Sequence, residues 1–270
     1  VDATGKIYQG STGVFKQGDI WEGKIGMYAT ASKNIDGKYP VIGSLLYEIA
    51  TKKYTMVTHS TEKQAYRYNR FISLVGNTYD FKNYIVSALK VEDEWKYEVA
   101  YANDINRIRF LYPPAIGENY VIINVEKATT DSNPQEILYA SVKDWKWTKL
   151  GEGLIYYPQI EGDSAFFSYN SSIWACDLTK SPTNIETGCR KVSKEGEKAT
   201  SPAVKKGNKN FITYTSGPGF YQVYMADITN EETVYKKIEL EISSDLISFI
   251  PDQWDGDIIA FSELYEYSEV

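Results

Sequence analysis

The sequence predicts an all-β fold made of one repeated unit. Its clearest sign is a recurring phrase in which Pro and an apolar residue precede a Gly turn and an apolar strand. The prolines that open the four copies are Pro114, Pro158, Pro202 and Pro251, at intervals of 44, 44 and 49 residues. Aromatic residues form 14% of the chain, which favours the half-buried, pleated surface of strands. Several short strands within a period of roughly 40–50 residues are typical of a β-propeller.

The best-defined repeat spans residues 153–196. After a lead-in, strands are expected at 165–169, 173–178 and 189–192, separated by clusters of Gly, Pro, Asn and Ser. The other repeats follow the same order and are expected at 16–65, 66–108, 109–152, 197–245 and 246–270. No segment of ten or more residues carries a 3.6-residue apolar stripe, so the sequence predicts no helix.

The last repeat has room for only two strands, whereas a radial blade has four. Two strand-like stretches, 5–10 and 13–16, are spare at the other end of the chain. We expect residues 1–15 to complete the last blade and close the ring. The prediction is therefore a six-bladed propeller, with five or seven blades as alternatives, forming one domain over residues 1–270.

Charge and hydropathy exclude several classes of protein. The net charge of −7 disfavours sequence-independent binding to nucleic acid. It equally disfavours electrostatic binding to an anionic membrane. No run of about 18 apolar residues is present, so no transmembrane segment is predicted. The chain begins at Val1, which fits either a processed mature chain or a trimmed one; in both cases any signal or anchor would have been removed.

Two cysteines, Cys176 and Cys189, flank a turn-rich stretch at hairpin spacing. Neighbouring outer strands of one blade would bring them together, so we expect a disulfide and an extracytoplasmic location, either secreted, periplasmic or on the cell surface. The alternative is a pair of buried thiols in a cytosolic protein. Asn170 begins an Asn-Ser-Ser acceptor sequence and is a possible N-glycosylation site.

Several phrases resemble the repeats of TolB-like propellers, a WD40-like group of extracytoplasmic repeats. An apolar-aromatic strand, an acidic residue and a small turn occur at 46–58, 173–178 and 223–228. The blade opening of that family, a Ser-Pro-like pair before a Gly-Asp-type turn, is similar to 201–208 and 250–257. The resemblance implies an envelope or surface protein, or a propeller attached to a peptidase. It supplies no shared catalytic residues that transfer to this chain.

Few residues suggest metal or catalytic chemistry. The single histidine, His59, leaves too few His and Cys ligands for a typical zinc site, and no Gly-x-Ser-x-Gly elbow accompanies it. The densest carboxylate group is Asp252, Asp255 and Asp257, a weak candidate for calcium. The competing interpretation is a structural turn, because Gly256-Asp257 repeats Gly162-Asp163. We therefore expect no cofactor, with calcium as the one alternative.

A glycosidase with a pair of axial carboxylates is the enzymatic alternative. Its candidates, at or near the blade openings, are Asp19, Asp104, Asp163 and Asp257. The Asp-Pro phrase at the N-terminus of five-bladed glycosidases is absent. Most of the six tryptophans are expected to pack between blades, while Trp145 and Trp147 are candidates for facing a ligand.

The favoured interpretation is a non-catalytic propeller that binds a protein or a glycan, with no catalytic or cofactor-binding residue assigned. The alternatives are a glycoside hydrolase-like propeller and a self-assembling subunit of an extracellular filament or surface layer.

Overall fold

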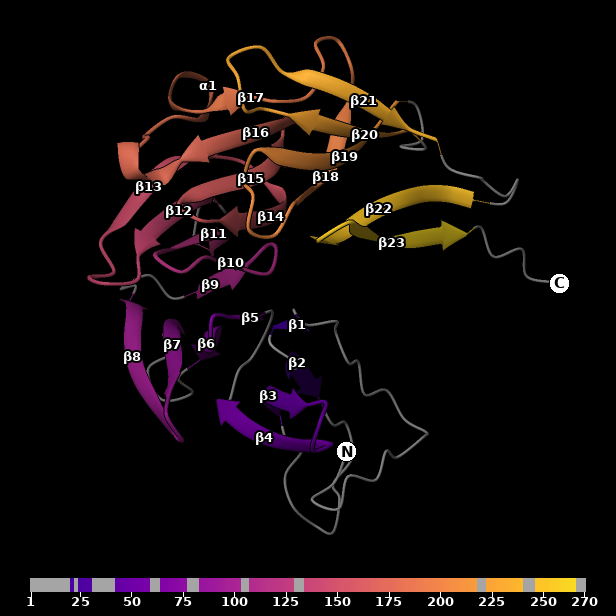
Figure 1. Cartoon of the computed structure of the whole chain (residues 1–270). Coiled ribbons are helices and arrows are strands. Elements are labelled where there is room, and N and C mark those ends of the chain that lie inside the picture. The colour runs from indigo at the N-terminus through magenta and orange to yellow at the C-terminus, as the bar shows by residue number, and fades with distance from the viewer. Residues whose placement is uncertain are drawn as a thin grey trace, which may run out of the picture. The chain divides into compact units, whose positions relative to one another are not determined.

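The computed structural model describes residues 20–21, 24–30, 42–58, 64–76, 83–102, 107–128, 134–217, 222–239 and 246–265 (Figure 1). The predictions for residues 1–15, Asp19, His59 and Asp104 lie outside these residues. The chain divides into two compact units, Val1–Ile116 with Val125–Gln135, and Gly117–Asn124 with Glu136–Val270.

The described residues form six antiparallel sheets. The first and second sheets hold β1 (Ile20–Trp21), β2 (Lys24–Thr30), β3 (Ile42–Glu48) and β4 (Lys53–Thr58), then β5 (Gln64–Arg67), β6 (Arg70–Gly76), β7 (Asn83–Val91) and β8 (Glu94–Ala102). The third holds β9 (Arg107–Phe110), β10 (Ala115–Ile116), β11 (Tyr120–Ala128), β12 (Gln135–Ser141) and β13 (Trp147–Glu152).

The remaining sheets belong to the second unit. The fourth holds β14 (Tyr156–Glu161), β15 (Ser164–Tyr169), β16 (Ser172–Asp177) and β17 (Arg190–Lys191). The fifth holds β18 (Ala199–Val204), β19 (Phe211–Ser216), β20 (Gln222–Asp227) and β21 (Val234–Ile238), and the sixth holds β22 (Leu246–Asp255) and β23 (Ile258–Tyr265). Within each sheet most strands follow one another in chain order, which is the simple meander that the repeat predicts.

Two short helical turns were missed by the sequence prediction. These are η1 (Leu178–Lys180) and α1 (Ile185–Gly188), both between β16 and β17. Asp177 caps η1 by accepting from the Thr179 backbone N–H, and Asn184 caps α1 through Thr187. A helix of four residues is too short to show a periodic apolar stripe, so only its caps signal it in the sequence.

The repeated prolines occupy equivalent places in their sheets. Pro158, Pro202 and Pro251 lie on the first strands β14, β18 and β22, at a sheet edge where no ladder donor is required. Each also lies at a shift in strand register. Tyr157 and Ser201, which precede two of these prolines, have φ values of 51° and 53°. The sequence phrase therefore encodes a bulged first strand.

The first strands end in glycine turns that also repeat. Gly162, Gly207 and Gly256 have φ values of 57°, 75° and 57°, a region that a Cβ atom disfavours. The turn carries the chain directly back into β15, β19 and β23 respectively.

Gly117, in the corresponding turn after β10, is required for a different reason. A Cβ added there would collide with Cγ2 of Ile160, which is fully buried on β14. We expect Gly117→Ala to lower the free energy of unfolding by about 1–3 kcal/mol, the usual cost of overpacking. Urea unfolding measures this, with Glu118→Ala at the exposed neighbouring position as the control. Equal stability of the two variants would contradict a close approach of this turn to β14.

Apolar side chains from neighbouring sheets form the core of each unit. In the first unit Leu46 and Val57 of the first sheet share a buried cluster with Phe71 of the second. Within the second sheet the ring of Phe71 packs with those of Tyr66 and Trp95, with centroids 4.7 and 5.8 Å apart. In the second unit, Tyr214 and Tyr224 stack within a cluster that includes Ile173, so the fourth and fifth sheets share a core. Burial of such faces supplies the main driving force for packing one sheet on the next.

Polar contacts add to this packing between the fourth and fifth sheets. The guanidinium of Arg190 on β17 reaches the segment that follows β20. It donates to the carbonyl oxygens of Ile228 at 3.1 Å and Glu231 at 2.7 Å, and to Thr233 Oγ1 at 2.8 Å. The planar fork of arginine suits three acceptors at once, whereas a lysine ammonium lacks this geometry.

Candidate functional site

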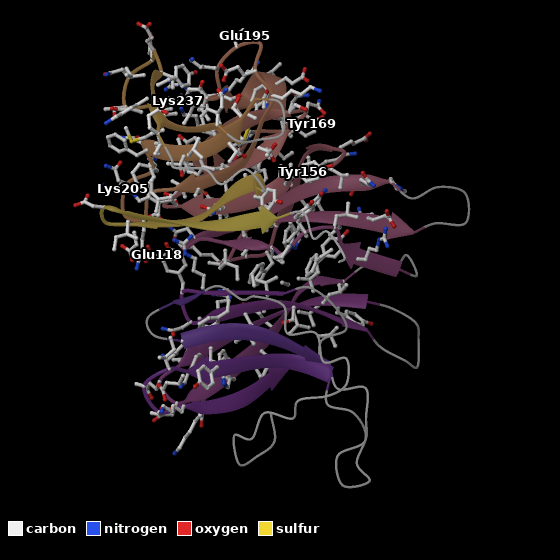
Figure 2. The ribbon with its side chains drawn as sticks, turned by 90° about the vertical axis from the view of Figure 1, so that its right-hand side faces the viewer. Glu118, Tyr156, Tyr169, Glu195, Lys205 and Lys237 are labelled. Carbon is white, nitrogen blue, oxygen red and sulfur yellow. A yellow bond between two sulfur atoms is a disulfide. The ribbon has the colours of Figure 1, made fainter. Side chains whose placement is uncertain are left out.

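The turns after the first strands of the third to sixth sheets carry polar residues, among them Asp163, Asp255 and Asp257, which the sequence analysis singles out. We call Asn119, Glu161, Asp163, Lys205, Lys206, Asp255 and Asp257 the first-turn row. All belong to the second unit. Figure 2 shows Glu118 and Lys205, from two of these turns, on one side of this unit, with Tyr156 and Tyr169 on the other.

Each member of the row contacts a neighbouring repeat, either the one before it or the one after it. Asn119 Nδ2 donates to Asp163 Oδ1 at 3.0 Å, across 44 residues of sequence. Glu161 is 8% exposed, and its Oε1 accepts from the Gly207 backbone N–H at 2.9 Å, across 46 residues. These separations match the sequence period, so each contact joins one sheet to its successor.

The last link of the row is ionic. Lys206 Nζ lies 3.1 Å from Asp255 Oδ2, and Lys205 Nζ lies 3.8 Å from Asp257 Oδ1. Lys205 also lies over the ring of Trp254, 5.4 Å from its centroid. The Lys206 backbone N–H donates to the Trp254 carbonyl at 2.8 Å, which fixes the two strands against each other.

This arrangement bears on the calcium prediction. Asp255 and Asp257 face ammonium groups, and Asp252 lies on β22 between them and Pro251. Within the described part of the chain, no group of three or more His, Cys, Asp or Glu side chains is placed to hold a metal ion. The lysine ammonium groups paired with Asp255 and Asp257 would repel a calcium ion at these carboxylates. Calcium binding here stays a prediction.

The glycosidase candidates Asp163 and Asp257 also belong to the first-turn row and contact the preceding repeat. Asp163 is held by Asn119 and Asp257 by Lys205, in contacts between consecutive repeats. What the row can do chemically is to fix the order and spacing of the sheets. The sequence signal for this structural role is the repeated Gly-Asp turn, because residues one repeat apart lie in neighbouring turns and contact each other.

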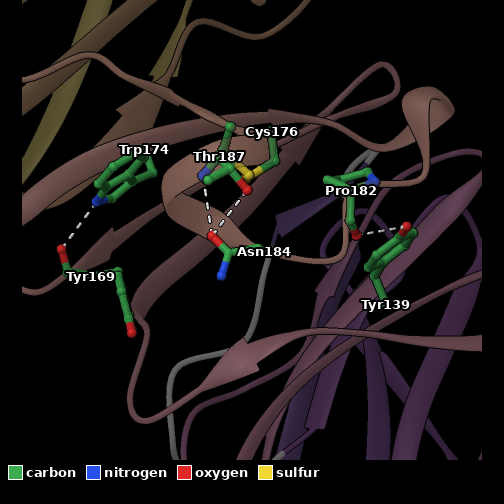
Figure 3. Close-up of a disulfide and its surroundings, with 8 residues drawn as sticks. Tyr139, Tyr169, Trp174, Cys176, Pro182, Asn184 and Thr187 are labelled. Atoms are coloured by element: carbon green, nitrogen blue, oxygen red, sulfur yellow. Dashed lines mark hydrogen bonds between the residues drawn. A yellow bond between two sulfur atoms is a disulfide. The ribbon is translucent and has the colours of Figure 1, made fainter.

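Aromatic residues gather at the opposite end of the fourth sheet. Tyr156, on β14, is 36% exposed (Figure 2). Trp174 Nε1 donates to the Tyr169 carbonyl at 3.2 Å (Figure 3). The sequence analysis did not name Tyr156 as a surface residue. Asn170 is exposed in the two-residue turn between β15 and β16, with φ of 49°.

The predicted aromatic pair Trp145 and Trp147 is brought together. The rings stack with centroids 6.3 Å apart and an interplanar angle of 25°, and both residues are half-buried. Trp145 lies in the turn before β13 and has φ of 51°, whereas Trp147 begins the strand. Their role in ligand binding stays a prediction.

The predicted disulfide is present. Cys176 on β16 and Cys189, which follows α1, are joined with an S–S distance of 1.99 Å and Cα atoms 4.4 Å apart (Figure 3).

None of the helices within the described residues has the length and hydropathy needed to span a bilayer.

The third strands of the fourth and fifth sheets end in the same Asp-x-Thr turn. Asp177 Oδ1 accepts from Thr179 Oγ1 at 2.6 Å and from the Thr179 N–H at 3.1 Å. Asp227 repeats this with Thr229, at 2.6 and 2.9 Å. In both turns the pKa of the aspartate carboxyl lies below its usual range, and the main cause is the hydrogen bond from the threonine hydroxyl.

Replacing Thr179 by Val is expected to raise the pKa of Asp177 toward its ordinary value of 3.8. Because the folded-state pKa is depressed, the turn contributes stability above the unfolded pKa and loses it as pH falls through the folded pKa. The stability difference from the unsubstituted protein should therefore be present near neutral pH, at less than about 1 kcal/mol, and vanish in acid. A Tm series against pH measures it, with the exposed Thr183→Val as control. A difference that is independent of pH would contradict the assignment.

Comparison with known proteins supports the fold. No protein-family model matches the chain, and no curated protein matches its sequence. Among solved structures, it is similar to prolyl oligopeptidase B from Galerina marginata, at 10% identity and a TM-score of 0.55 over 83% of this chain and 34% of that one.

The chain is also similar to an oligogalacturonate lyase from Vibrio parahaemolyticus, at 10% identity and a TM-score of 0.52 over 85% of this chain. It spans 64% of the length of that lyase. A third similar structure is the β-propeller domain of the Trilobed protease from Pyrococcus furiosus, at 11% identity and a TM-score of 0.51, covering 89% of this chain and 72% of that one.

At such identities the likeness shows the fold alone. The all-β prediction and the β-propeller prediction are therefore confirmed. The number of blades, the closure of the ring and membership of the TolB-like group stay predictions.

Proposed function

We propose that this protein is a non-catalytic β-propeller that binds a protein or a glycan in an extracytoplasmic compartment. The ring has six blades, and residues 1–15 complete the last one. The observation that supports this best is the first-turn row, in which Asp163 and Asp257, two of the carboxylates that a glycosidase would use, contact side chains of the preceding sheet. A scaffold of this kind leaves its ends and loops available for recognition.

The partner is sought with the purified chain on a glycan array and by cross-linking to surface extracts of the source cells. Aromatic side chains are the expected contacts for a glycan because sugars stack on them, so Tyr156→Ala and Trp147→Ala should weaken glycan binding. Loss of binding in Asp257→Asn but not in these variants would contradict an aromatic site.

A carbohydrate-active enzyme is the second candidate, because the fold is shared with an oligogalacturonate lyase. Incubation with oligogalacturonates and with a panel of glycosides separates the two proposals. Turnover that is lost in Asp163→Asn or Asp257→Asn, with an unchanged Tm, would establish the enzyme and overturn the scaffold.

The extracytoplasmic location and self-assembly have their own tests. The disulfide should be intact in protein taken from the source cells, which non-reducing against reducing electrophoresis measures. Sedimentation of the purified chain over a range of concentrations tests whether it forms a filament or layer, the third alternative.

A further inference from the structure

The segment between the two cysteines contacts a sheet other than its own. We call Asp177–Gly188 the clasp segment. It leaves the fourth sheet after β16 and returns to β17, and its apolar residues Leu178, Pro182 and Ile185 are buried, while most of the residues between them are exposed. Such alternation in a loop indicates that it is anchored along its length and is not merely a solvent-exposed connection.

The anchors lie on the third sheet. Tyr139 on β12 donates its hydroxyl to the Pro182 carbonyl at 3.1 Å, in a buried position (Figure 3). Gly151 on β13 leaves the space that the Ile185 side chain fills, since a Cβ there would lie 3.3 Å from Ile185 Cδ1. The same added atom would lie 3.7 Å from Ile137 Cδ1, so Ile185 packs beside the apolar face of β12.

The strand to which the clasp segment returns is weakly held by backbone pairing. β17 is two residues long and pairs with β16 at Trp174↔Lys191 and Ala175↔Arg190, and one more backbone bond follows, from the Val192 N–H to the Ile173 carbonyl at 2.8 Å. The disulfide joins Cys176 on β16 to Cys189, the residue before β17, at the base of the segment. Closing this loop restricts the freedom of the undocked segment, which favours the docked state.

We propose that the clasp segment is a redox-controlled clasp between the third and fourth sheets. Cys176 is fully buried and Cys189 is half-buried, so a dithiol reductant reaches the bond from the Cys189 side. A reductant thiolate attacks Cys189 Sγ, the S–S bond breaks, and Cys176 leaves as a thiolate that takes up a proton. The second reductant thiol then displaces Cys189, leaving two cysteine thiols and one oxidised reductant. The freed segment undocks and exposes the surface around Ile137, Tyr139 and Gly151.

Hydrogen exchange on the intact chain, oxidised and after reduction with dithiothreitol, tests this. Exchange should rise in residues 177–188 and on the contacted strands, 137–151, and stay unchanged in the fifth sheet, 199–238. Trypsin cleavage after the exposed Lys180 should speed up by on the order of tenfold or more, because a protease needs a locally opened segment.

Two variants of the oxidised chain make the test independent of the cysteines. Ile185→Ala should reproduce the faster cleavage with the disulfide intact, and Glu186→Ala, at the exposed neighbouring position, should not. Unchanged exchange in 177–188 after complete reduction, verified by thiol alkylation, would overturn the proposal. A parallel loss of protection over the whole chain would also overturn it, since the disulfide would then stabilise the fold globally.

Discussion

Replacing Asn124 by Leu is expected to lower the free energy of unfolding by about 2–4 kcal/mol, because it removes three hydrogen bonds to backbone groups, one of them buried. Asn124, on β11, is 1% exposed. Its Nδ2 donates to the carbonyls of Glu136 at 3.1 Å and Gly153 at 2.9 Å, and its Oδ1 accepts from the Ile155 N–H at 3.2 Å.

The substitution keeps roughly the side-chain volume of Asn124 but removes its three hydrogen bonds to the backbone. Leu fills a similar volume, so the expected loss comes from desolvated backbone groups and not from a cavity. These groups lie at the start of β12 and in the connection from the third to the fourth sheet, which makes Asn124 a fixing point for that connection.

Urea unfolding measures the effect, and Asn124→Asp serves as the matched variant. Asp keeps Oδ1 but directs a carboxylate at two carbonyl oxygens, so it should be strongly destabilised near neutral pH and partly recover in acid when the carboxyl is protonated. A Leu variant within about 0.5 kcal/mol of the unsubstituted protein would contradict the structural role of Asn124.

The parts of the fold that the sequence predicts are those with a local physical cause. Pro158 and Pro202 exclude a central strand position, and Gly162 and Gly256 supply turns with positive φ, so their spacing gives the repeat. The disulfide also follows from local spacing, since Cys176 and Cys189 flank a hairpin-like turn.

What the sequence does not predict depends on partners from separate segments. The three partners of Asn124 are 12, 29 and 31 residues away, and a buried Asn looks in sequence like any polar strand residue. Likewise, Tyr157 has φ of 51°, although tyrosine seldom adopts that region, because the bulge before Pro158 imposes it.

The candidate site shows the same division. The acidic turn at Asp255 and Asp257 is evident in the sequence, but its interpretation as a calcium site or a structural turn depends on what faces it. Lys205 and Lys206 lie one repeat earlier, so an alignment of the repeats could have suggested the ion pairs. The docking of Ile185 against Gly151 had no such signal, because it joins two repeats through a short insertion.

Removing residues 1–15 is expected to have the other largest effect. The sixth sheet contains two strands within the described residues, β22 and β23, whereas a propeller blade has four. If residues 1–15 complete this blade, their loss leaves an exposed sheet edge and opens the ring, and each blade relies on its neighbours to bury its apolar faces.

Differential scanning calorimetry of the chain lacking residues 1–15 therefore tests the closed ring most directly. Removal of residues 1–4 alone, which spares both strand-like stretches, is the matched control. The closed six-bladed ring predicts a fall in Tm of more than about 10 °C for the longer deletion and almost none for the control. A shift of only about a degree for the longer deletion would contradict closure by the N-terminal residues.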